Sequence, residues 1–347
     1  PLRLKPRPVL FCAGDVLATM LGTESMNFHT NWNPEVGLWW VPGPGHTPET
    51  RSAARVHPGR LAAWKLAAAA THKRLSAVEV TRVLRNLRSM QETQGPKRGR
   101  FRWYWEESHP HDSNASFFTG LGLLVFHFEA GPLLTEPDRS LLLAMLKDLR
   151  PWFAGELSRL SKNLRYPNKT LGDLVCAWLL AEALNDDAAP LEAPLARAAS
   201  YYQDEHWGWG EHLSDTYAKV IQFELTALLL YGRRLPRTLR AQYEALLLDL
   251  NRLDALFAKG PRVPAIRSYQ FLESPQKPGG WTQRSFIESI RTAPKDSGEG
   301  LFSALLLPAH REKFHRRYKP AAQGNPFPSI PCFGGAKAEV VLDKRYR

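Results

Sequence analysis

The stretch LAAWKLAAAATHKRL, residues 61–75, decides the fold class of this chain. Alanine, leucine and lysine dominate it, and these residues are among the most favourable to an α-helix. The serine at position 76 can cap a second helix, so SAVEVTRVLRNLRSMQ, residues 76–91, predicts another helix almost directly afterwards. This region therefore predicts two consecutive helices.

Helix-like runs continue through most of the remaining chain. They cover residues 115–130, 136–160, 170–184, 193–205, 214–232 and 236–260. The count is about seven to nine helices, and several runs are apolar nearly all round, which is typical of helices that pack on more than one side. We therefore expect an all-α fold, an α/α toroid of helical hairpins with little strand.

The two ends of the chain have a different character. Residues 1–60 are rich in proline, glycine, asparagine and tryptophan, which predicts an irregular or short-stranded segment packed on the barrel. Residues 336–347 alternate in a strand-like way. We expect an N-terminal segment over 1–60, the toroid domain over 61–320 and a C-terminal extension over 321–347.

Composition limits the partners. The 347 residues carry a formal net charge of +12, which favours a polyanionic partner. No zinc-finger, RRM-like or homeodomain pattern accompanies the charge, so nucleic acid is not expected. No run approaches the ~20 apolar residues that a membrane span needs. The three cysteines lie far apart, and no metal-binding or nucleotide-binding motif is present, so neither a metal nor another cofactor is expected.

Five loops combine aromatic, titratable and turn-forming residues. Successive loops are separated by roughly 40–60 residues, about the length of one helical hairpin. Loops one hairpin apart emerge at the same end of a toroid, so this spacing predicts that all five surround one mouth. The loops cover residues 45–60, 103–114, 164–169, 206–212 and 262–271.

The loop WYWEESHPHDSN, residues 103–114, offers several ligand-contacting side chains. We select Trp105, His109, His111 and Asn114 as candidates. The alternative is an ordinary helix start, in which Asp112 or Ser113 caps the helix that begins near residue 115.

The other loops supply the remaining candidates. Arg165, Asn168 and Lys169 could bind a carboxylate, or Asn168 could simply cap the next helix. In HWGWGEHLSDTY, residues 206–217, the glycines allow close ligand approach and the tryptophans can stack on sugars; the alternative is a tryptophan pair sealing a helix junction. Arg262 and Tyr269 are substrate-binding candidates or part of a basic linker. The candidates of the 206–217 stretch are Trp207, Trp209, Glu211, His212 and Tyr217.

In its layout over residues 60–290 the chain resembles the α/α-toroid polysaccharide lyases, the single-domain alginate and glucuronan lyases above all. RYPNKTLGDLVCAWLLAEAL looks like the helix start that carries a carboxylate-neutralising asparagine, here Asn168. HWGWGEHLSDTYAKV looks like the segment that carries the catalytic tyrosine, here Tyr217. Many such lyases have histidine directly after the asparagine, whereas Lys169 stands here. The base is then His212, a histidine of the 109–111 pair, or Tyr217 itself.

The resemblance implies β-elimination on a uronic-acid-containing polysaccharide. Neutralising the substrate carboxylate stabilises the enolate-like transition state, while a tyrosine or histidine moves the proton. We expect Tyr217 and His212 as the acid–base pair, with Glu211 and His111 as further catalytic candidates. Trp105, Trp207 and Trp209 would line the sugar subsites. A secreted or periplasmic location is expected.

Two other functions stay open at this point. A glycoside hydrolase on the same architecture would use two carboxylates, such as Glu106 or Asp112 with Glu211, as acid and base. A non-catalytic helical module would bind a polyanion in a salt-sensitive way, without turnover.

Overall fold

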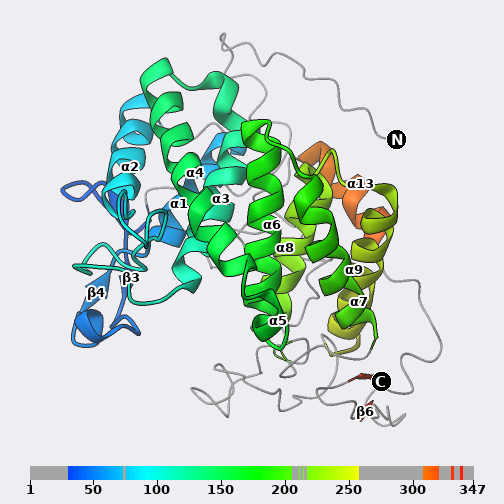
Figure 1. Ribbon diagram of the computed structural model, residues 1–347. Coiled ribbons are helices and arrows are strands. Elements are labelled where there is room, and N and C mark those ends of the chain that lie inside the picture. Colours follow the sequence, from blue (N-terminus) through cyan, green and yellow to red (C-terminus); the bar gives the residue numbers. More distant parts are fainter. Residues whose placement is uncertain are drawn as a thin grey trace.

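The computed structural model describes residues 30–72, 76–204, 211, 214, 217–257, 308–319, 330–331 and 337–338. This part of the chain is mostly helical and holds ten α-helices, which confirms the all-α prediction (Figure 1). The helices are α1 (Gly59–His72), α2 (Ala77–Ser89), α3 (Asn114–Ala130), α4 (Glu136–Leu157), α5 (Leu160–Asn163), α6 (Pro167–Leu184), α7 (Glu192–Gln203), α8 (Tyr217–Tyr231), α9 (Arg237–Phe257) and α13 (Pro308–Tyr318).

The helix starts follow local chemistry. Ser76 caps α2 as predicted: its hydroxyl accepts from the Glu79 backbone N–H, and the Glu79 carboxylate accepts from the Ser76 backbone N–H. This reciprocal arrangement is a capping box, which satisfies two amide donors at once. Thr135 caps α4 by accepting from the Asp138 backbone N–H.

The long helices form two layers. The inner layer contains α1, α3, α6 and α8, and each of these helices packs against the next. The outer layer contains α2, α4, α7 and α9. In it α2 packs against α4 and α7 packs against α9, and all four pack against inner helices. In Figure 1 the colours run from blue to yellow across the molecule, so successive hairpins lie side by side. Closure of this row into a toroid stays a prediction.

Small residues bring the inner helices close together. Nearly every residue of α3, α6 and α8 is buried, as expected for helices covered on several sides. A Cβ atom added at Gly122 would lie 2.8 Å from the Cβ of Ala63, and one at Gly172 would lie 2.7 Å from Cγ of Phe117. These two glycines therefore set the spacing of α1 against α3 and of α3 against α6.

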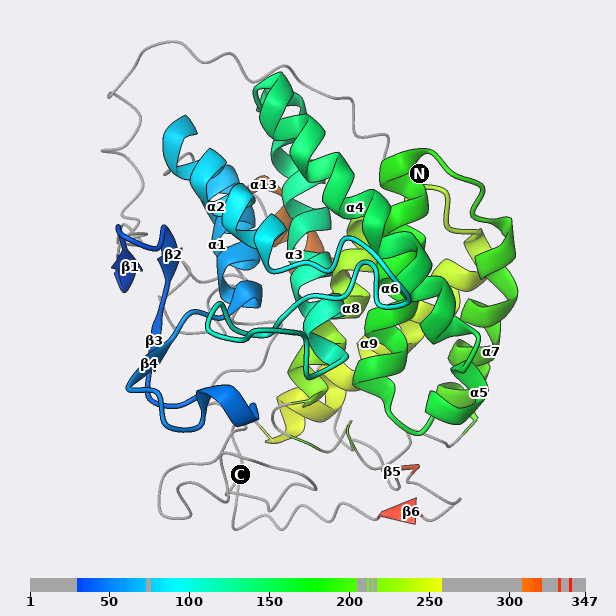
Figure 2. The same cartoon turned by 60° about the vertical axis from the view of Figure 1, so that its left-hand side comes forward.

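Short strands and a 3₁₀ turn precede α1. Strand β1 (Trp32–Asn33) pairs with β2 (Leu38–Trp39), and β3 (Val41–Pro42) pairs with β4 (Arg55–Val56), both antiparallel. The turn η1 (Pro48–Thr50) lies between β3 and β4. Within residues 30–58 the short-stranded character predicted for residues 1–60 is confirmed, and these strands lie at one side of the bundle in Figure 2.

The remaining short elements complete the described chain. The turns η2 (Gly131–Leu133) and η3 (Ala189–Leu191) precede α4 and α7. Near the C-terminus β5 (Ile330–Pro331) pairs antiparallel with β6 (Lys337–Ala338), at the start of the stretch that was predicted to be strand-like. Within the described residues, every helix is too short or too polar to span a lipid bilayer.

Candidate active site

The loops that precede the inner helices lie next to one another. The backbone N–H of Gly59, at the start of α1, donates to the carbonyl of Trp103 at 2.9 Å. The ring of Phe117 in the first turn of α3 packs beside Lys169 and Gly172 in the first turns of α6. These contacts bring the starts of three inner helices to one end of the bundle.

The start of α8 joins the same row. The backbone N–H of Asn168 donates to Oε2 of Glu211 at 2.9 Å, across 43 residues of sequence. The first three predicted loops therefore lie side by side in the order of the sequence, and Glu211, the one described residue of the fourth loop, lies beside the third. The fifth loop, with Arg262 and Tyr269, lies outside the described residues, as do Trp207, Trp209 and His212.

The first two loops build a chain of three polar side chains. Nδ1 of His46 lies 2.8 Å from the hydroxyl of Tyr104, and Nε2 of His46 lies 3.4 Å from Oδ2 of Asp112. With the Nε2 proton directed at Asp112, Nδ1 accepts the hydrogen bond from the phenol. The same phenol oxygen accepts the backbone N–H of His46 at 3.4 Å. The arrangement is suited to moving a proton between Tyr104 and His46.

Gly45 permits this geometry. Its backbone N–H donates to the Thr50 carbonyl at 3.0 Å, which closes the loop around η1. A Cβ atom at Gly45 would lie 2.7 Å from Cβ of Thr50 and 2.7 Å from Cε2 of Tyr104. Any larger residue would push the Tyr104 ring away from His46.

Arg60 lies beside this group among aromatic rings. Its guanidinium carbon is 5.2 Å from the ring centroid of Trp103, 5.4 Å from that of Phe118 and 5.8 Å from that of Trp64. Burial lowers the pKa of the Arg60 guanidinium, and its interaction with Tyr104 partly offsets this. Arg60 forms no ion pair with any carboxylate in the part of the chain described above. Among the described residues, its closest neighbours are therefore aromatic rings and not a carboxylate.

Asp112 links the two interpretations of the 103–114 loop. Its Oδ1 accepts the backbone N–H of Asn114, the first residue of α3, at 2.8 Å, so the capping alternative is confirmed. Its Oδ2 is the atom that faces His46. Burial acts to raise the pKa of Asp112, but the hydrogen bonds from His46 and Asn114 outweigh it and lower that pKa. One carboxylate thus serves both the helix start and the polar chain.

His57 and Glu106 form a second contact between the same loops. Nδ1 of His57 lies 2.5 Å from Oε1 of Glu106, and Nε2 lies 3.1 Å from the Asn33 amide. Burial acts to raise the pKa of Glu106, yet hydrogen bonds from His57 outweigh it and lower that pKa. Trp105 is half-buried, and its backbone N–H donates to the His57 carbonyl at 3.0 Å. This part of the loop is held mainly by structural contacts.

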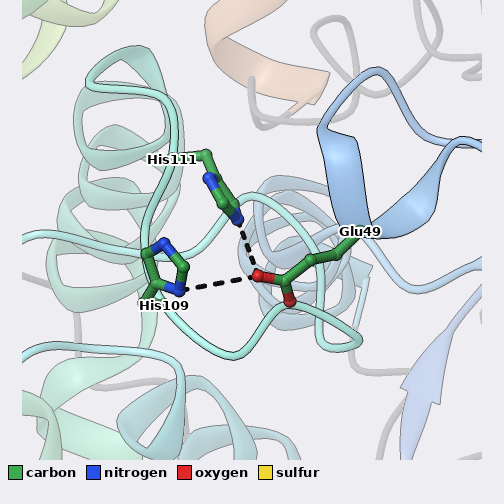
Figure 3. A group of neighbouring side chains, drawn as sticks. All are labelled: Glu49, His109 and His111. Atoms are coloured by element: carbon green, nitrogen blue, oxygen red, sulfur yellow. Dashed lines mark hydrogen bonds and ion pairs between the residues drawn. The ribbon is translucent and has the colours of Figure 1, made fainter.

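The predicted histidine pair lies at the edge of the loop. His109 and His111 both face the carboxylate of Glu49, as Figure 3 shows. The backbone N–H of Ser108 and the imidazole of His111 hydrogen-bond to Glu49 and lower its pKa to about 2. The group is largely exposed to solvent.

The surroundings of Lys169 do not support the substrate-binding role that was predicted for it, which stays a prediction. Its ammonium group is buried, lies 2.8 Å from Oε2 of Glu156 and forms a second ion pair with Asp173. Both partners are buried, so the charge of Lys169 is compensated inside the core. The stretch RYPNK did not reveal this pairing, because Glu156 belongs to α4 and the packing of α6 against α4 cannot be read from that stretch.

The other two residues of this motif also differ from expectation. The side chain of Asn168 is buried, and Asn168 is the second residue of α6, whose N-cap position is Tyr166, so the capping interpretation is wrong. Burial does not fit a role in contacting a dissolved polymer. Arg165 is exposed, and its guanidinium lies 5.0 Å from the Tyr166 ring centroid, so it stays available to an anion.

Acidic residues accumulate behind Lys169. Burial raises the pKa of Asp173 to about 7, against the opposing effect of Lys169. Burial also raises the pKa of Glu224 well above its usual range, and Glu211 and Asp173 raise it further. Both carboxylate oxygens of Glu224 lack a hydrogen-bond partner in the described structure. Burial thus favours the protonated form of both acids.

Tyr217 is the first residue of α8, close to the predicted loop. It is half-buried, and its backbone N–H donates to Oγ of Ser214 at 3.2 Å. Glu211, a predicted catalytic residue, is buried beside Asn168. The proposed pairing of Tyr217 with His212 stays a prediction because His212 lies outside the described residues.

Three side chains of the polar group were not selected from the sequence. They are His46, Arg60 and Tyr104, all within loops whose convergence the spacing predicted. Their neighbours in the sequence could have indicated them. Gly45 stands beside His46 and Trp103 stands beside Tyr104, and both patterns are typical of a closely packed loop. Comparison of the chain with protein-family models, with curated proteins and with solved structures finds no match.

Proposed function

We propose that the protein is a polysaccharide lyase that cleaves a uronic-acid-containing polysaccharide by β-elimination. The observation that carries the proposal is the hydrogen-bonded chain from Tyr104 through His46 to Asp112, next to the guanidinium of Arg60, which pairs with no carboxylate of the described residues. It supplies a proton-transfer group and a carboxylate-binding cation at the same place. The site proposed here differs from the Tyr217 and Asn168 site expected from the sequence.

Arg60 is assigned to the substrate carboxylate. A guanidinium that lacks a protein counter-ion and lies against aromatic rings gains most from an incoming anion, because little water screens the interaction. Withdrawal of charge from the carboxylate acidifies the C5 proton of the uronate and stabilises the enolate-like transition state. Arg60 as a whole residue is partly exposed, and it lies at the start of α1, at the end of the bundle where the loops meet.

Tyr104 is assigned to the proton. As its phenol passes a proton to Nδ1 of His46, the phenolate oxygen takes the proton from C5. The electron pair left at C5 forms the C4–C5 double bond as the C4–O4 bond breaks. The Tyr104 hydroxyl then gives the C5 proton to the leaving oxygen, and Nδ1 of His46 returns the first proton to the phenolate, which restores both side chains. Asp112 stabilises the transient imidazolium, and the His46 backbone N–H stabilises the phenolate.

The charge of the whole chain favours the same substrate class. A net charge of +12 attracts a polyuronate over long distances, in a manner that salt weakens. Arg165, exposed at the start of α6, would extend the cationic surface along the row of loops.

Incubation of the purified protein with alginate, glucuronan, pectate and glycosaminoglycans tests the proposal. β-Elimination creates an unsaturated uronate that absorbs in the near ultraviolet, whereas hydrolysis creates new reducing ends without this absorption. We expect ultraviolet-absorbing products from at least one polymer. Reducing ends alone would support a hydrolase, and salt-sensitive binding without any product would support a binding module.

A further inference from the structure

The exposed group formed by Glu49, His109 and His111 has the composition of a metal site. One ligand atom from each side chain lies within 4.8 Å of the other two. Oε1 of Glu49 is 2.8 Å from Nε2 of His111 and 3.5 Å from Nδ1 of His109. Figure 3 shows both imidazole rings directed at the same carboxylate oxygen from one loop, with Glu49 opposite them.

We propose that Glu49, His109 and His111 bind a divalent transition-metal ion, for which Zn²⁺ has the best-fitting chemistry. Two imidazole nitrogens and one carboxylate oxygen are typical ligands of zinc, while Mg²⁺ and Ca²⁺ prefer oxygen ligands alone. The exposure of the group leaves room for water in the remaining coordination position. This inference does not depend on the proposed lyase activity.

The spacing of the ligand atoms agrees with the size of the ion. Zinc–nitrogen and zinc–oxygen bonds of about 2.0–2.2 Å in a tetrahedron place ligand atoms roughly 3.3 Å apart. The His109–Glu49 separation of 3.5 Å already fits. The His111–Glu49 separation of 2.8 Å is that of a hydrogen bond, and it needs to widen by roughly half an ångström. Metal binding would replace the proton in this bond.

Groups around the ligands hold them in position. The backbone N–H of Ser108 donates to Oε2 of Glu49 at 2.6 Å, which leaves Oε1 directed at the two imidazoles. The Ser108 hydroxyl lies 2.8 Å from Oε1 of Glu49 and 2.8 Å from Nδ1 of His109, and with a metal present it would donate to Glu49. Arg100 donates to the carbonyl of His111 at 2.8 Å and fixes the backbone there. Such outer contacts orient ligands and raise metal affinity.

The ion would join two segments that are far apart in the sequence. Glu49 belongs to η1, whereas both histidines belong to the loop before α3. Because the unfolded chain does not hold these ligands together, bound metal should stabilise the folded state.

Calorimetric titration of tag-free, chelator-treated full-length protein with Zn²⁺ tests the site. We expect saturable binding of one equivalent and little binding of Mg²⁺ or Ca²⁺. E49Q and H111N should weaken Zn²⁺ binding at least about 100-fold, since loss of even an outer-shell partner costs 10–100-fold. Glu136→Gln and His127→Asn, which lie outside the group, serve as matched controls and should bind like the unaltered protein.

A second variant and a second measurement protect the test against misfolding. The side chain of His109 is 57% exposed, so H109N should keep its helical circular dichroism and still lose Zn²⁺ affinity. X-ray absorption should report nitrogen and oxygen neighbours at about 2.0–2.2 Å and no sulfur. The proposal is overturned by an absence of one-to-one binding, or by folded ligand variants that bind as tightly as the controls.

Discussion

Tyr104 and His46 are separated by 58 residues, yet the phenol of one lies 2.8 Å from Nδ1 of the other. The contact exists because the loop before α1 and the loop before α3 meet at one end of the helical layers. Asp112 extends the chain of hydrogen bonds, and Arg60 lies beside it among three aromatic rings. Each of these placements has a consequence that can be measured.

Replacement of Arg60 tests the assignment of the carboxylate-binding cation. R60M should lower kcat/KM on the active polyuronate by about 10²-fold or more, the usual cost of removing one group that stabilises developing charge. R165M is the matched control, because Arg165 was the cation expected from the sequence and is exposed. R165M should change kcat/KM by no more than a few-fold. If R165M lowers kcat/KM more than R60M does, the substrate carboxylate binds near the start of α6 and not beside Arg60.

A methyl group at Gly45 should separate Tyr104 from His46. G45A places a Cβ atom 2.7 Å from Cε2 of Tyr104, and we expect a loss of about 1–3 kcal/mol in the free energy of unfolding, as for other overpacked sites. Gly155 in α4 has open space around it, so G155A should instead stabilise the helix by about 0.5–1 kcal/mol. Denaturant unfolding of G45A and G155A measures both changes. If G45A is as stable as the unaltered protein, the loop relaxes freely around Tyr104.

Lys169 should matter for stability rather than for substrate binding. K169M leaves Glu156 and Asp173 buried without their cation, and removal of one member of a buried pair costs about 3–5 kcal/mol. Thermal and denaturant unfolding measure this loss. If K169M folds normally but raises KM for the polymer, Lys169 contacts substrate after all.

Asp173 should make stability depend on pH in the opposite sense to most carboxylates. Its folded-state pKa is raised from 3.8 to about 7, so the folded protein holds this proton more tightly than the unfolded chain. The stability that the proton contributes is present below pH 4 and is lost as pH rises through about 7. Relative to D173N, the unaltered protein should therefore lose stability between pH 4 and pH 8. The exposed Asp204 provides the control, since D204N should run parallel to the unaltered protein over this range.

The helices and the convergence of loops could be predicted because both follow from local patterns. Alanine and leucine periodicity predicted α1 to α4 and α6 to α9 but not the single turn α5, and Ser76 predicted the start of α2. The interval between polar-aromatic loops predicted that the loops before successive inner helices would lie next to one another. The hydrogen bond between Asn168 and Glu211 is one such contact. Hairpin length alone fixes this feature.

The roles of individual side chains could not be predicted in the same way. Lys169 was interpreted as a substrate-binding residue because its neighbours in sequence are polar, but its partner Glu156 comes from another helix. His46 was overlooked because its partners stand 58 and 66 residues away. Burial and pairing are decided by tertiary contacts, and a single motif does not contain them.

In the proposed β-elimination Tyr104 carries the proton, and Y104F removes the hydroxyl group that this role requires. The assay is the rate of ultraviolet-absorbing product from the polyuronate, with Y201F on α7 as the matched control. We predict that Y104F keeps its helical circular dichroism and loses about 10²-fold or more of kcat, while Y201F stays near the unaltered rate. A Y104F protein that forms product at the normal rate would contradict the account.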